Sequence, residues 1–221
     1  MSRAGTLAFL AVSVWAAAAV ASDPAPRHLI YLHGRIVQEQ QDARPHSPRF
    51  GYYELEKILA ELRSRGFEVT GEIRPRSASV SESADRVVAQ VHELLASGVP
   101  ADRILVVGAS MGGGIALLSS ARLQNPELRF AVLGACASET DARLVADGGK
   151  GLSGRVLSIH EASDEYTRSC PPWTEDPTRS GIQVREIVLH TGLEHGFLYR
   201  PLPEWVDPVV EWSTLGIIPP R

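Results

Sequence analysis

The chain has 221 residues, enough for one α/β domain with a sizeable core. Its 22 basic and 26 acidic side chains give a formal net charge of −4, and no basic tract is present, so a nucleic-acid partner is not expected. The two cysteines have no metal-ligand spacing to each other or to a histidine, so neither a metal nor another cofactor is expected.

Residues 1–21 have the pattern of an export signal. Arg3 gives a basic start, the stretch from Leu7 to Val20 is apolar, and Ala19-Val20-Ala21 supplies the small residues of a cleavage site. An uncleaved membrane anchor is the alternative, but the apolar run is shorter than the roughly 20 residues that cross a bilayer. We therefore expect a signal peptide at 1–21, a domain at 22–221 without a stable membrane anchor, and a periplasmic or secreted protein.

The rest of the chain alternates strand and helix patterns. In chain order, these are a strand at 27–32, a polar loop through Pro48, a helix at about 51–65, a strand at 67–73, a helix at 79–97, a strand at 103–107, a helix from about Gly113, strands at 129–135, 155–160 and 183–190, and a helix at about 203–214. Unalternating apolar strands linked by helices are typical of a parallel sheet covered on both faces. The pattern predicts an α/β fold with a mostly parallel sheet of about six strands.

Two of the helices carry specific sequence signals. An apolar stripe at helical spacing marks the first, formed by Leu55, Ile58, Leu59 and Leu62. Ser79 and Glu82 have the spacing of a capping box at the start of the second.

The most informative motif is Gly108-Ala109-Ser110-Met111-Gly112, which lies between a predicted strand and a predicted helix. A serine at the apex of such a sharp turn stands clear of the sheet, and the glycines permit a strained backbone there. The motif alone is weak evidence, because glycine and serine are common in ordinary turns. The strand–helix context favours a nucleophilic serine.

Two further polar residues follow later strands. Asp164 lies beyond the strand that ends at His160, and His195 lies beyond the strand that ends at His190. Ligands of parallel α/β sheets bind outside the carboxyl ends of the strands, so these residues are candidates for a site with Ser110.

The order Ser110, Asp164, His195 is that of the α/β-hydrolase triad. Together with His33-Gly34 after the first strand and Glu194-His195-Gly196-Phe197 near the end, it makes nearly all of the mature sequence resemble the α/β-hydrolase superfamily. The chain looks like a small, lid-less, esterase-like serine hydrolase. It lacks the family's two usual opening strands, so a trimmed version of that fold is expected.

The resemblance implies a role for each site residue. Ser110 is the nucleophile, His195 the general base, and Asp164 the carboxylate that orients the imidazole. The oxyanion donors are the backbone N–H groups of Met111 and, from the loop after the first strand, Arg35. In this family a histidine at the position of His33 braces that loop.

Several assignments stay open from the sequence. Glu161 and Glu165 share a loop with Asp164, and Asp141 follows the preceding strand, so each is an alternative acid. The alternative base is His190, although packing at a strand end suits it better.

The cysteines and arginines also leave alternatives. Cys136 and Cys170 form a disulfide if the protein is exported, or otherwise two separate buried thiols. Three arginines follow strands on the active edge and either recognise an anionic group or are solvated or paired locally, for example with Glu72: Arg35, Arg74 and Arg76.

The loops suggest the kind of substrate. The stretch 137–154 is too short and too polar for a cap domain, whereas 36–49 is long enough to overhang the site. An open, shallow site suits a small-molecule ester, such as a short-chain ester, an acetylated sugar or a thioester. The leading hypothesis is an exported carboxylesterase-like enzyme that works through an acyl-enzyme. A thioesterase, a peptidase or a ligand-binding protein without turnover are the alternatives, and the sequence does not indicate an oligomeric state.

Overall fold

The computed structural model of the protein describes residues 27–136, 151–170 and 182–215. The predicted signal peptide at 1–21, most of the stretch 137–154 and the alternative acid Asp141 lie outside these residues.

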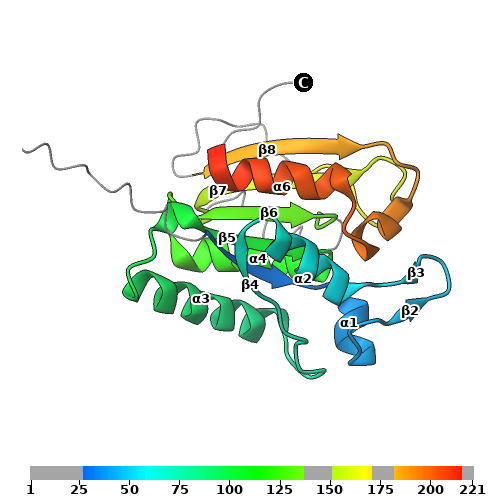
Figure 1. Ribbon diagram of the computed structural model, residues 1–221, viewed down its shortest axis with the longest axis horizontal. Coiled ribbons are helices and arrows are strands. Elements are labelled where there is room, and N and C mark those ends of the chain that lie inside the picture. Colours follow the sequence, from blue (N-terminus) through cyan, green and yellow to red (C-terminus); the bar gives the residue numbers. More distant parts are fainter. Residues whose placement is uncertain (1–26, 137–150, 171–181, 216–221) are drawn as a thin grey trace, which may run out of the picture.

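The described residues form a central sheet of six parallel strands in the order β4-β1-β5-β6-β7-β8 (Figure 1). The strands are β1 (Arg27–Leu32), β4 (Phe67–Thr70), β5 (Ile104–Ala109), β6 (Arg129–Leu133), β7 (Gly154–Glu161) and β8 (Ile182–Leu189). Every residue of β5 and β6 is buried, which explains why these strands are apolar apart from Arg129 at the start of β6. The predicted parallel sheet is confirmed.

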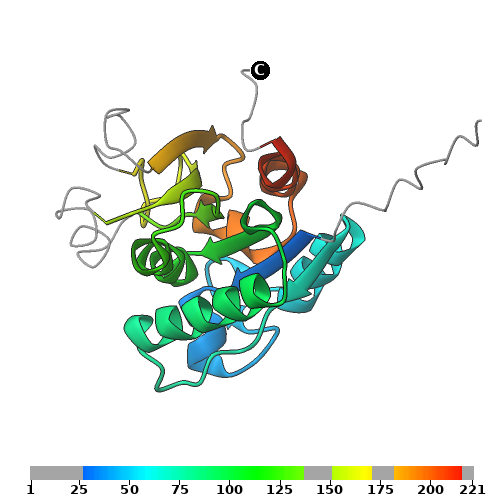
Figure 2. The same cartoon turned by 90° about the vertical axis from the view of Figure 1, so that its left-hand side faces the viewer.

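Helices cover both faces of the sheet. One face carries α2 (Leu55–Ser64) and α6 (Pro203–Leu215), and the other carries α3 (Val80–Ala96) and α4 (Met111–Leu123) (Figure 2). Each pair of helices buries its own apolar core against the strands. No helix within the described ranges has both the length and the apolar character needed to cross a bilayer.

The local signals of the sequence correspond to observed contacts. The Ser79 hydroxyl accepts a hydrogen bond from the Glu82 N–H, and the Glu82 carboxylate accepts one from the Ser79 N–H, which is the predicted capping box of α3. The four residues of the apolar stripe on α2 are all buried.

The region between β1 and α2 differs from the prediction. The expected polar loop contains α1 (Arg35–Gln40) and β2 (His46–Ser47), and the start of the predicted helix is instead β3 (Gly51–Tyr52), which forms a short antiparallel hairpin with β2. The helix predicted from about Gly51 therefore begins at Leu55. Elements this short carry no readable period, and Gly51 has a φ of +79°, which ends any helix there. In Figure 1, α1 and the hairpin lie beyond the carboxyl ends of the sheet strands.

A smaller correction applies to β4, which ends at Thr70 and not at the predicted Ile73. Two 3-10 helices complete the described elements: η1 (Ala101–Arg103) leads into β5, and η3 (Glu194–Tyr199) follows β8.

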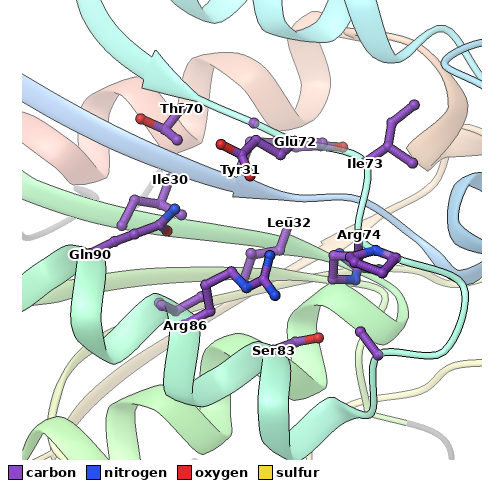
Figure 3. Close-up of a pocket in the computed structure, with 14 residues that line it drawn as sticks. Ile30, Tyr31, Leu32, Thr70, Glu72, Ile73, Arg74, Ser83, Arg86 and Gln90 are labelled. Atoms are coloured by element: carbon purple, nitrogen blue, oxygen red, sulfur yellow. The ribbon is translucent and has the colours of Figure 1, made fainter.

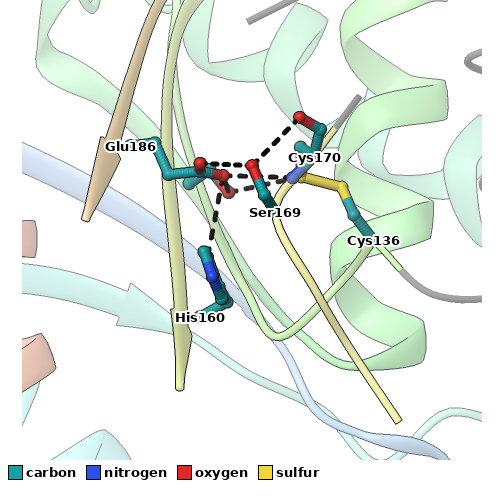
Figure 4. The surroundings of a disulfide bond; sticks show 6 residues. Cys136, His160, Ser169, Cys170 and Glu186 are labelled. Carbon is teal, nitrogen blue, oxygen red and sulfur yellow. Dashed lines mark hydrogen bonds and ion pairs between the residues drawn. A yellow bond between two sulfur atoms is a disulfide. The ribbon is translucent and has the colours of Figure 1, made fainter. Parts of the chain in front are cut away.

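Cys136 and Cys170 form a disulfide, so the alternative of two separate thiols is wrong (Figure 4). The bond joins the segment that follows β6 to the loop after β7, with the two Cα atoms 5.0 Å apart. On the Cys170 side, Glu186 of β8 accepts hydrogen bonds from the Cys170 N–H at 3.0 Å and from the Ser169 hydroxyl at 2.5 Å (Figure 4). The disulfide and Glu186 thus fix the far end of the loop that carries Asp164.

Replacing both cysteines with alanine is expected to lower the free energy of unfolding by about 3–4 kcal/mol, because the bond spans 34 residues and restricts the unfolded chain. Urea denaturation under non-reducing conditions measures the change. The single variant Cys136→Ala is the control and should lose about as much as the double variant, since either one removes the same bond. An unfolding midpoint equal to that of the unchanged protein would refute a stabilising disulfide.

Candidate active site

Ser110 lies at the sharp turn between β5 and α4. Its φ of 54° and ψ of −120° are unusual for a residue with a side chain, so its backbone is strained. A Cβ added to Gly108 would overlap the backbone of Gly112, and one added to Gly112 would overlap the carbonyl of Leu32. The two glycines of the motif are therefore required for the close approach of α4 to β1 and β5.

Ser110, His195 and Asp164 form a continuous chain of hydrogen bonds. The His195 Nε2 atom lies 3.0 Å from Ser110 Oγ, and His195 Nδ1 lies 2.7 Å from Asp164 Oδ2. The three residues come from the turn after β5, the loop after β7 and the helix η3. Asp164 lies 31 residues and Ser110 lies 85 residues before His195 in the sequence, and the fold brings all three together at one edge of the sheet.

The surroundings of Asp164 favour its ionised form. Burial raises the pKa of this carboxyl, but hydrogen bonds from His195, the Thr167 hydroxyl and the Tyr166 N–H outweigh it, so the pKa lies below its ordinary value. An ionised carboxylate at Nδ1 keeps the proton on that nitrogen and leaves Nε2 free to accept the proton of Ser110.

The alternative acids within the described residues do not contact His195. Glu161 is buried, and its carboxylate accepts hydrogen bonds from the N–H and hydroxyl of Thr191 and from the hydroxyl of Ser163. It joins the turn after β7, which leads to Asp164, to the turn after β8, which leads into η3 and His195. Glu165 is exposed at the surface and pairs with Arg49 at 2.9 Å.

The structure also distinguishes the two candidate bases, His190 and His195. His190 is exposed at the end of β8, whereas His195 reaches Ser110.

The predicted oxyanion donors occupy equivalent places in two helices. Met111 is the first residue of α4 and Arg35 the first residue of α1, and the first N–H groups of a helix have no partner within it. Gly34, which precedes α1, lies close to the serine, since a Cβ added to this glycine would be 3.6 Å from the Cβ of Ser110. Both residues line the same cavity as Ser110.

His33 holds the peptide that precedes Arg35. Its Nδ1–H donates to the Gly34 carbonyl at 2.8 Å, and its Nε2 accepts from the Arg74 N–H at 3.1 Å. In a planar trans peptide the N–H points opposite to the C=O, so this arrangement directs the Arg35 N–H away from His33. Burial and the charge of Arg74 lower the pKa of His33 to about 4, which keeps the imidazole neutral and Nε2 able to accept at neutral pH.

The three arginines at the strand ends have different surroundings. The buried Arg74 donates to the His33 carbonyl at 2.6 Å and to the Gln38 side chain at 3.1 Å, so it supports the loop that carries Arg35. It lines a separate small cavity of about 40 Å³ between β1 and α3 (Figure 3). Arg76 is exposed and lines neither cavity. Only Arg35 shares a cavity with Ser110.

The cavity at Ser110 has a volume of about 630 Å³, within the usual range of small-molecule sites. Ile36 and Glu39 of α1 line it, as does Phe50 before β3, so the segment after β1 contributes a wall. The cavity wall also includes residues that no sequence motif indicates: Phe50, Tyr53, Tyr166, Thr167, Leu198 and Tyr199. The one available signal in the sequence is that Tyr166, Thr167, Leu198 and Tyr199 lie within a few residues of Asp164 or His195. Within the described ranges, no group of histidine, cysteine, aspartate and glutamate side chains is arranged to hold a metal ion.

No protein-family model and no curated protein sequence matches this chain. Solved structures, in contrast, are similar to it over most of its length. A Klebsiella pneumoniae protein provisionally described as a dienelactone hydrolase has a TM-score of 0.59 at 13% identity, covering 89% of this chain and 90% of its own.

Two further similar structures are esterases. One of the two described from the fungus Rhizomucor miehei has a TM-score of 0.56 at 14% identity, covering 86% of this chain and 74% of its own. A hyperthermophilic esterase from Pyrobaculum calidifontis has a TM-score of 0.54 at 16% identity, with 85% and 75% covered. At these identities the likeness concerns the fold, and this chain has the α/β-hydrolase fold.

Proposed function

We propose that the protein is an exported serine hydrolase that cleaves a small carboxylic ester through an acyl-enzyme. The observation that carries this proposal is the hydrogen-bonded chain from Ser110 through His195 to the ionised Asp164, at the wall of a cavity of about 630 Å³. The esterases with the same fold support it as analogies.

In the first half of the reaction, His195 Nε2 takes the proton of Ser110 while Oγ attacks the acyl carbon. The acyl oxygen becomes an anion, and we expect the N–H groups of Met111 and Arg35, at the starts of α4 and α1, to donate to it. When the bond to the alcohol breaks, His195 returns its proton to the leaving oxygen, and the acyl group stays on Ser110.

In the second half, a water molecule takes the place of the alcohol. His195 removes a proton from this water as it attacks the acyl carbon, and then returns a proton to Ser110 Oγ as the acid leaves. Asp164 stabilises the imidazolium in both halves without taking the proton itself.

Export is supported by the disulfide, because such bonds persist mainly in oxidising compartments. Together with the signal-like pattern at 1–21, it supports our proposal of a periplasmic or secreted enzyme.

A fluorophosphonate probe tests the proposal directly. We expect one equivalent of probe on Ser110, located by peptide mapping, and turnover of short acetate esters. Labelling without turnover would indicate that esters are the wrong substrates, in favour of a thioesterase or a peptidase. A protein that is neither labelled nor active on any of these substrates would be a ligand-binding protein and would overturn the proposal.

Replacing Asp164 with asparagine is expected to lower kcat by about 10⁴-fold, because the imidazole then adopts the wrong tautomer and loses its counter-charge. Steady-state hydrolysis of an acetate ester measures it. The matched control is Glu165→Gln in the same loop, which removes an exposed carboxylate that does not contact His195 and should retain most activity. A fully active Asp164→Asn variant beside an inactive Glu165→Gln variant would show that the acid is misassigned.

A further inference from the structure

Two aromatic rings flank His195 from separate segments of the chain. The ring centroid of Phe50, which precedes β3, is 6.2 Å from that of His195, and the ring centroid of Tyr166, in the loop after β7, is 5.6 Å from it. Both residues line the cavity that contains Ser110. Neither is used by the mechanism described above.

Their exposure distinguishes them from ordinary core residues. Tyr166 has 53% of its surface exposed, and Phe50 is half-buried. On its covered side Phe50 packs on Gly196 and, at 5.6 Å between centroids, on Tyr199. The protein therefore leaves aromatic surface open at the cavity, directly beside the imidazole.

Arg49 lies beside both rings and forms ion pairs with residues next to Tyr166 and His195. Its guanidinium forms ion pairs with Glu165 at 2.9 Å and with Glu194 at 2.5 Å, the immediate neighbours of Tyr166 and His195 in sequence. It also lies 5.4 Å from the centre of the Phe50 ring and 5.6 Å from that of the Tyr166 ring. Two carboxylates thus neutralise its charge, and the rings are positioned before any ligand binds, which limits the entropy lost on binding.

The reaction geometry says which part of a substrate meets these rings. Because His195 returns its proton to the leaving oxygen, that oxygen must lie at Nε2, and the group attached to it must lie beside the imidazole. We infer that Phe50 and Tyr166 form the leaving-group subsite, and that this subsite takes the flat aromatic portion of an ester's alcohol. The inference rests on the proposed function.

The arrangement of the two rings limits how such a group binds. Their centroids are 6.1 Å apart and their planes meet at 79°, so they already form an edge-to-face pair and leave no slot between them for a third ring. An aromatic alcohol portion packs instead against the cavity side of the pair. Aromatic contacts of this kind favour an aromatic ring over a saturated one by about two- to tenfold.

Benzyl acetate and cyclohexylmethyl acetate provide a matched pair of substrates, since both carry the same acyl group and a six-membered ring on a primary alcohol. We expect the unchanged protein to favour benzyl acetate in kcat/KM by about two- to tenfold. Phe50→Leu and Tyr166→Leu should each move this ratio toward one, whereas Tyr166→Phe should keep it. The control is Tyr52→Leu, an exposed hairpin tyrosine outside the cavity lining, which should also keep the ratio.

The ratio separates a subsite from a purely structural role. If the rings only support His195, both substrates will slow equally in the leucine variants and the ratio will not change, which would overturn the inference. A ratio of one in the unchanged protein would overturn it as well. If fluorophosphonate labels the protein but the protein hydrolyses neither acetate, Ser110 remains the proposed nucleophile and the leaving-group subsite is refuted. A protein that is neither labelled nor active fails the proposed function itself.

Discussion

Ser110→Ala is expected to lower kcat for ester hydrolysis by about 10⁶-fold and to abolish labelling by fluorophosphonate. The hydroxyl is the only atom of this side chain that reaches His195, and its loss removes the atom that would carry the acyl group. Residual turnover would come from binding and from the N–H donors alone, with water as the nucleophile. Steady-state kinetics at high enzyme concentration and intact-protein mass spectrometry after labelling measure both effects.

The fold of the Ser110→Ala variant must be checked alongside its activity. The alanine inherits the φ of 54°, so its thermal unfolding should stay close to that of the unchanged protein. The exposed Ser77 lies in the loop before α3, and Ser77→Ala serves as the matched serine control that should keep full activity and labelling. Stoichiometric labelling of the folded Ser110→Ala protein would show that another residue is the nucleophile.

His195→Ala is expected to have an effect of similar size, about 10⁶-fold in kcat, because the members of such a triad act as a unit and Ser110 without its base is a poor nucleophile. Labelling by fluorophosphonate should slow in parallel. The matched control is His190→Ala, five residues earlier and exposed at the end of β8, which should retain its activity.

Because His195 also packs against Phe50 and Tyr166, the alanine variant leaves a gap in the cavity wall. A second variant, His195→Gln, fills much of that space but provides no base, and it should be as inactive as His195→Ala. Activity in either His195 variant together with its loss in His190→Ala would reverse the assignment of the two histidines.

The sequence was most informative where the physics is local. Unbroken apolar runs predicted the buried strands, the spacing of Leu55, Ile58, Leu59 and Leu62 predicted the buried face of α2, and Ser79 with Glu82 predicted the start of α3. The motif around Ser110 was readable for the same reason, since the sharp turn and its glycines lie within a few residues of one another.

Hydrophobic periodicity gave a wrong prediction, or none, where a helix or strand was too short to show a repeat. The helix α1 has six residues and the strands of the hairpin have two each, so the segment after β1 was predicted as a loop. This segment supplies Phe50, Ile36 and Glu39 to the cavity wall, and the sequence therefore gave little information on the shape of the site.

Only the tertiary structure decided which distant side chains meet. The sequence favoured Asp164 as the acid but kept Glu161 and Glu165 of the same loop as alternatives. In the structure, hydrogen bonds direct Glu161 to Thr191, an ion pair directs Glu165 to Arg49, and Asp164 contacts His195. The sequence left the pairing of Cys136 with Cys170 open, and the structure joins them in a disulfide. The sequence also left Arg74 as a candidate for anion recognition, whereas in the structure its guanidinium is buried and donates to the His33 carbonyl. The physical reason is the same in each case. Composition and spacing determine which residues follow a strand, whereas the packing of several strands and loops determines which neighbour each side chain contacts.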